Sequence, residues 1–77
     1  MSNKNLFQSF YSQATQLFEY QKYDEAIEKY LAAMEHDEKN LNLLVDLGSA
    51  YLEAGKLEDA RTSFLKALNI DSNNSKL

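Results

Sequence analysis

The sequence predicts an all-α protein in which four antiparallel helices form two tandem hairpins. Three observations support this prediction: proline is absent, apolar residues recur at spacings of three and four, and the chain repeats itself after 34 residues. Isoleucine and valine are limited to Ile27, Val45 and Ile70, whereas alanine, leucine, glutamate and lysine, which favour helices, are abundant. No stretch alternates with period two, so no strand is expected.

The first hairpin is expected to contain helices at about 5–20 and 24–36. Asn5 is the expected N-cap of the first helix, with Gln8 three residues later as in a capping box. Apolar residues at helical spacing predict one buried face on each helix. They are Phe7, Phe10, Tyr11, Ala14, Leu17 and Phe18 in the first helix, and Ala26, Ile27, Tyr30, Leu31, Ala33 and Met34 in the second.

The second hairpin is expected to contain helices at about 41–54 and 58–70. Asn40 is the expected N-cap of its first helix. Gly55 suits the left-handed residue just past a helix end, and Glu58 and Asp59 then lie near the positive end of the next helix dipole. The apolar positions are Leu41, Leu44, Val45, Leu47, Gly48, Tyr51 and Leu52, followed by Ala60, Phe64, Leu65, Ala67 and Leu68.

The two hairpins are copies of one unit. A shift of 34 residues aligns residues 7–40 with residues 41–74, which we take as repeat 1 and repeat 2, after a lead-in of residues 1–6. Residues 75–77 are then a tail or the start of a truncated third repeat. Identical pairs are Glu19/Glu53, Lys22/Lys56, Ala26/Ala60, Leu31/Leu65, Ala33/Ala67, Asp37/Asp71 and Asn40/Asn74.

This period and residue pattern resemble the tetratricopeptide repeat family. The signature reads Leu44, Leu47, Gly48, Tyr51, Gly55, Ala60, Phe64 and Ala67 in repeat 2, and Phe10, Ala14, Leu17, Ala26, Tyr30 and Ala33 in repeat 1. Repeat 1 departs from it at Gln13 and Gln21, and Glu38 and Ser72 stand where the family places proline. The resemblance implies two hairpins stacked as a short right-handed α-solenoid.

Small residues are expected where the two helices of each hairpin meet. By the resemblance, Gly48 faces Ala60 in repeat 2, and Ala14 faces Ala26 in repeat 1, while Phe64 and Tyr30 fill the adjoining space. Because helix axes pack closer when the contact residues are small, Gly48 is predicted to be structural despite its cost in a helix.

The resemblance also implies a non-catalytic protein–protein interaction module, with a concave groove lined by the first helix of each repeat. The groove positions are Gln8, Tyr11, Ser12, Thr15, Phe18 and Glu19, then Asn42, Val45, Asp46, Ser49, Leu52 and Glu53. These positions include carboxylates and no lysine or arginine, which favours a hydrophobic or basic peptide or helix as partner. Two alternatives are that Tyr11 and Val45 pack between helices, and that the carboxylates form a solvated face.

Other classes of function have little support. The chain has no cysteine and a single histidine, so neither a metal site nor another cofactor is expected. A net charge of −4 argues against nucleic acid, and no apolar run approaches the length of a membrane span. No hydroxyl has the surroundings of an activated nucleophile, and His36 is expected to pack at a helix end. We therefore expect a cytoplasmic protein that is not an enzyme.

Two repeats are few for an array, because each repeat buries its face only against a neighbour. The last helix carries Phe64, Leu65, Leu68 and Ile70, more apolar surface than one flanking helix covers. The chain is therefore expected to be a fragment of a longer array, a homo-oligomer, or both. The alternative function is a structural scaffold that stacks or dimerises through its exposed repeat faces.

Overall fold

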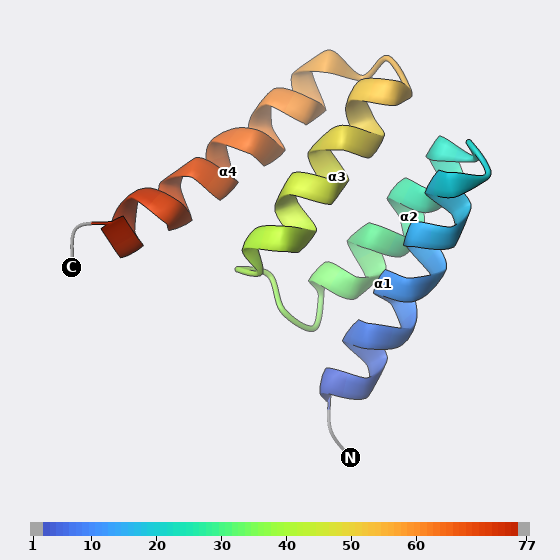
Figure 1. Ribbon diagram of the computed structural model, residues 1–77, viewed down its shortest axis with the longest axis horizontal. Coiled ribbons are helices and arrows are strands. Elements are labelled where there is room, and N and C mark those ends of the chain that lie inside the picture. The colour runs from blue at the N-terminus through green and yellow to red at the C-terminus, as the bar shows by residue number, and fades with distance from the viewer. Residues whose placement is uncertain (1–2, 76–77) are drawn as a thin grey trace.

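The computed structural model describes the backbone of residues 3–75 and the side chains of residues 5–71, and within these limits it contains four helices and no strand (Figure 1). They are α1 (Asn3–Glu19), α2 (Tyr23–Met34), α3 (Leu41–Glu53) and α4 (Leu57–Ser75). The predicted all-α fold of two helical hairpins is confirmed.

The helices form a single layer, with principal extents of 38 × 36 × 16 Å. Helix α2 packs against both α1 and α3, and α3 in turn packs against α4. Toward its C-terminal end α4 diverges from α3 (Figure 1). The main core therefore lies among the first three helices and consists of Phe7, Ala14, Ala26, Ile27, Tyr30, Ala33, Leu43, Leu47 and Ala50.

The two hairpin turns are built alike. The backbone N–H of Lys22 donates to the carbonyl of Leu17 at 2.9 Å, and that of Lys56 donates to the carbonyl of Tyr51 at 2.8 Å. These are the six-to-one bonds of a Schellman motif, which requires a left-handed residue just before the donor. Gly55 fills that place with φ 81°, as predicted, but in the first turn Gln21 does so with φ 65°.

Two predicted helix boundaries are wrong. Asn5 is not an N-cap, because α1 already begins at Asn3 and Asn5 lies within its first turn. Helix α4 does not end at residue 70 but continues to Ser75.

The second error concerns the end of the second helix, where the two repeats differ. Asn40 caps α3, as predicted, because its side chain accepts a hydrogen bond from the Leu43 N–H at 3.0 Å. Its amide also donates to Asp37 at 3.2 Å, which stabilises the turn that follows α2. Repeat 2 carries Asp71 and Asn74 at the corresponding places, yet α4 continues through them, with no proline or glycine there to stop it.

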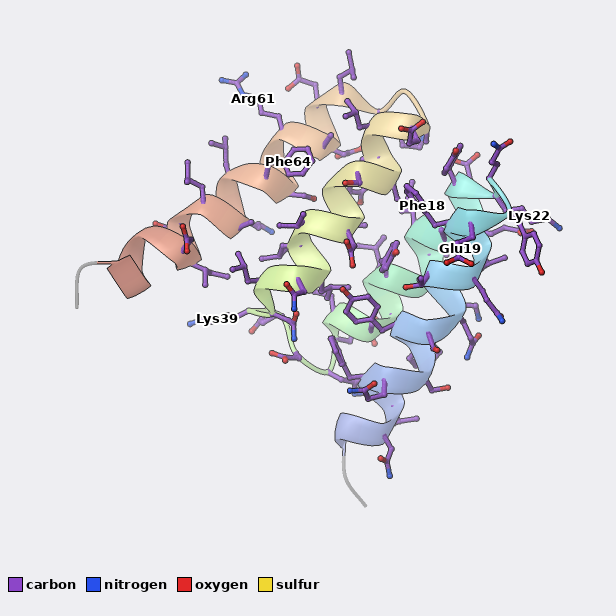
Figure 2. All side chains as sticks on the ribbon, in the orientation of Figure 1. Phe18, Glu19, Lys22, Lys39, Arg61 and Phe64 are labelled. Atoms are coloured by element: carbon purple, nitrogen blue, oxygen red, sulfur yellow. The ribbon has the colours of Figure 1, made fainter. Side chains whose placement is uncertain are left out.

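A close contact is present at Gly48, but its nearest neighbour is Phe64, which was expected in the adjoining space, rather than Ala60. A Cβ atom added to this glycine would lie 2.7–2.9 Å from three ring carbons of Phe64, so any side chain here would force the ring to move. Figure 2 shows Phe64 on the side of α4 that faces α3, and Arg61 on the opposite side. In the first hairpin, Ala14 and Tyr30 occupy the corresponding positions and both are buried.

Substituting each of the two left-handed turn residues tests the Schellman geometry. Gln21→Gly should raise the free energy of unfolding by up to about 1 kcal/mol, because glycine adopts positive φ without a Cβ penalty. Gly55→Ala should lower it by about 1 kcal/mol, although no atom lies within 4 Å of the added Cβ. Urea unfolding followed by circular dichroism measures both changes. Equal shifts of the same sign would contradict this account of the turns.

Candidate protein-binding surface

Helices α1 and α3 are joined across one face of the layer by Tyr11 and Asp46. The Tyr11 hydroxyl donates a hydrogen bond to Asp46 Oδ2. The same ring packs edge-on against Phe7 and Tyr30, with centroid distances of 5.4 and 5.8 Å. Tyr11 therefore packs between the helices and also forms part of the floor of the face, so the two interpretations offered for it are compatible.

Two depressions follow this face, which we call the groove. The larger, of about 520 Å³, lies along α1 and the start of α3, and the smaller, of about 240 Å³, lies beside it. The larger is lined by Phe7, Gln8, Tyr11, Ser12, Thr15, Gln16, Glu19, Asn40 and Asn42, and the smaller by Thr15, Phe18, Glu19, Tyr30, Asp46 and Ser49. Most of the expected groove residues thus line these two depressions. Phe7, Gln16, Tyr30 and Asn40 line them as well, although they were not among the expected groove residues.

Phe18 lines the smaller depression, whereas the expected residues Val45, Leu52 and Glu53 line neither. Phe18 is half-buried and packs edge-on against Tyr23, with centroids 5.2 Å apart. Leu52 and Glu53, at the end of α3, are exposed but line neither depression. Val45 is exposed and lines a third depression instead.

This third depression, which we call the notch, lies between α3 and α4 and has a volume of about 520 Å³. Its lining includes the expected residues Tyr11, Asn42, Val45 and Asp46, but also Leu41, Phe64, Ala67, Leu68 and Asp71. Sequence reasoning placed Phe64 and Leu68 on an uncovered apolar face but not in a site with Val45. Their joint exposure depends on the divergence of α3 and α4, which no residue pattern indicates.

The electrostatics of this side are acidic. The groove depressions and the notch are lined by Glu19, Asp46 and Asp71 and by no lysine, arginine or histidine. Lys22 and Lys39 lie instead in the connections at the two ends of α2 (Figure 2). A positively charged partner would therefore be attracted to this side.

Three tyrosines are held in their neutral form. Burial raises the pKa of Tyr11 above the ordinary tyrosine value, and its hydrogen bond to Asp46 raises the pKa further. Burial likewise raises the pKa of Tyr30 and of Tyr51. The phenol of Tyr11 is therefore a hydrogen-bond donor throughout the physiological range.

His36 lies just past the end of α2 and contacts Phe10 of α1. Its half-buried ring stacks on Phe10, with centroids 6.1 Å apart and planes 10° from parallel, and Lys29 Nζ lies 5.7 Å from the centre of the same Phe10 ring. Across the described residues, no cluster of three potential metal ligands occurs and no helix is long and apolar enough to cross a membrane.

Comparison with known proteins agrees with the hairpin geometry. A model of the tetratricopeptide repeat family matches residues 17–77. The chain belongs to the tetratricopeptide repeat family. It is 30% identical over 76 residues to sperm-associated antigen 1 from Rattus norvegicus; the match covers 99% of this chain and 8% of that relative. Tetratricopeptide repeats are generally non-catalytic, and membership of the family implies a module for protein–protein interaction.

The Tyr11–Asp46 contact predicts a loss of stability at alkaline pH. Because the folded pKa of Tyr11 lies above the unfolded value of about 10, its contribution is complete below about pH 10 and is lost as pH rises toward the folded pKa. Tyr11→Phe should lower the free energy of unfolding by about 1 kcal/mol at neutral pH, yet decline less steeply above about pH 10. Urea unfolding at several pH values measures this, with Tyr20→Phe as an exposed control. Equal alkaline slopes for wild type and Tyr11→Phe would contradict the assigned role.

Proposed function

We propose that this module binds a hydrophobic or basic peptide or helix of a partner protein in the groove of α1 and α3. The observation that carries the proposal is the combination of apolar contact surface with carboxylates and no cation among the lining residues. Tyr11 is already positioned by Asp46 and Tyr30, and Phe18 by Tyr23. Because these two aromatic side chains are ordered before a partner binds, little side-chain entropy would be lost on binding.

The polar lining supports an extended or helical segment rather than a small molecule. Gln8, Ser12 and Asn42 offer donors and acceptors along the larger depression. Glu19 lines both depressions and can pair with a cationic side chain at the junction between them. Apolar contacts at the centre with polar groups at the rim are typical of protein interfaces. A cytoplasmic location stays a prediction.

A pair of designed peptides tests the proposal. Both are amphipathic helices with the same leucine and phenylalanine face, one carrying lysines and the other glutamates on its polar face. The lysine peptide should bind about tenfold or more tightly, and its affinity should fall with added salt. Fluorescence anisotropy with the complete chain measures both affinities. Equal binding of the two peptides would contradict the proposal.

Matched variants locate the binding surface. Leu52→Ala and Glu19→Lys should weaken binding of the lysine peptide, because Glu19 lines both depressions and Leu52 is an exposed residue of α3 that corresponds to Phe18 by the 34-residue shift. Leu65→Ala and Glu28→Lys remove the same chemistry from exposed sites outside the groove and should leave binding unchanged. Circular dichroism confirms that all four variants stay folded. The groove assignment fails if the two pairs behave alike.

The second candidate is a structural element that assembles with copies of itself. It is supported by the exposure of Leu65 and Leu68 on α4, large apolar side chains that another chain would bury. Sedimentation velocity over a range of concentrations separates the two candidates. Assembly requires a mass that rises with concentration and that Leu65→Lys returns to the monomer value, whereas a strict monomer excludes it.

A further inference from the structure

The notch is the uncovered counterpart of a face that is covered in the first hairpin. Phe64 corresponds to Tyr30 by the 34-residue shift, yet Phe64 is 36% exposed and Tyr30 only 3%. Leu68 corresponds to Met34, and is 61% exposed where Met34 is half-buried. The corresponding helical face is thus buried on α2 and exposed on α4. What covers it in the first hairpin defines what would fit the notch.

The cover of the first hairpin is one stripe of α3. Leu43, Leu47 and Ala50, spaced at i, i+4 and i+7, are at most 2% exposed and join the cluster that contains Tyr30 and Ala33. Residues at this spacing lie on one side of a helix. An occupant of the notch should therefore be a helix with two large aliphatic residues and one small residue at the same spacing.

Helix α1 of a second copy does not meet this requirement. At the three corresponding positions it carries Ser9, Gln13 and Gln16, all exposed, and Gln13 Nε2 donates to Ser9 Oγ at 3.2 Å. Docked into the notch, these polar groups would be buried against Phe64 and Leu68 with no partner beyond that one bond, which is unfavourable. Head-to-tail stacking of identical copies is therefore disfavoured by this end of the molecule.

The charge of the notch adds a second requirement. When α3 covers the first hairpin, Asp46 receives a hydrogen bond from Tyr11. In the second hairpin the residue corresponding to Tyr11 is Val45, which offers no hydroxyl, and Asp46 and Asp71 line the same depression. A carboxylate at that position of an incoming helix would meet like charges, whereas a lysine or arginine would be attracted.

We infer that the notch docks one amphipathic helix of a partner protein that repeats the Leu43–Leu47–Ala50 stripe and carries a basic residue where α3 carries Asp46. The partner helix then lies against α4 as α3 lies against α2. The notch shares Tyr11, Asn42 and Asp46 with the groove, whereas Phe64 and Leu68 of α4 line the notch and neither groove depression.

The test uses the complete chain and a peptide with the sequence of residues 40–54 carrying Asp46→Lys and a fluorescent label. Anisotropy should report saturable binding that Leu68→Glu weakens by about tenfold or more, because a carboxylate would be introduced into the apolar contact. Leu68 is largely exposed, so the variant should fold, and Leu68→Ala gives a milder second measurement. Phe18→Ala should leave this binding unchanged, which separates failure at the notch from failure at the groove.

A matched peptide supplies the control. Adding Leu43→Ser and Leu47→Gln to the same peptide gives its stripe the polarity of α1 and should abolish binding, and restoring Asp46 should weaken it. The inference is overturned if the lysine peptide does not bind, if the polar-stripe peptide binds equally, or if Leu68→Glu has no effect. It is also overturned if sedimentation shows a dimer that Leu68→Glu dissociates, since a second copy would then be the occupant.

Discussion

The structure depends on α3 being buried on two sides at once. One stripe of this helix, Leu43, Leu47 and Ala50, packs on the first hairpin, and the adjoining side, at Gly48, contacts Phe64 of α4. Full burial of a leucine contributes about 1.5–3 kcal/mol, so two such residues are a large part of the stability of a domain this small. Without the stripe, two hairpins of marginal stability would remain, because a helical pair alone leaves one face uncovered.

The same burial explains the arrangement of the candidate binding surfaces. Since two sides of α3 are occupied, its remaining side, with Asn42, Val45 and Asp46, is presented beside α1 and forms the groove and the edge of the notch. The ends of the layer differ in polarity, with Ser9 and Gln13 exposed on α1 and Leu68 exposed on α4. The two outer helices of a repeating fold thus present faces of different polarity.

Local chemistry was predictable from the sequence where a residue type determines a conformation. Gly55 in the left-handed region, the Asn40 cap, and the need for a small residue at Gly48 all follow from residue preferences and the period of 34. The groove itself stays a prediction, although most of its expected positions gather in two adjoining depressions. Boundaries that depend on context were not predictable: α1 begins before Asn5, and α4 continues to Ser75 although repeat 1 has a turn at the corresponding place. The notch was missed for a related reason, since the angle between α3 and α4 depends on packing that a one-dimensional pattern does not contain.

The most direct measurement exchanges the residues that distinguish the two first helices. Leu47→Gln gives α3 the residue that α1 carries at position 13, and Gln13→Leu makes the opposite change at an exposed site. Urea unfolding should show that Leu47→Gln lowers the free energy of unfolding by about 2–5 kcal/mol, through lost apolar burial and an amide without a partner. Gln13→Leu should change it by no more than about 0.5 kcal/mol. Small and equal effects of the two substitutions would show that the stripe of α3 does not hold the hairpins together, and the account would be wrong.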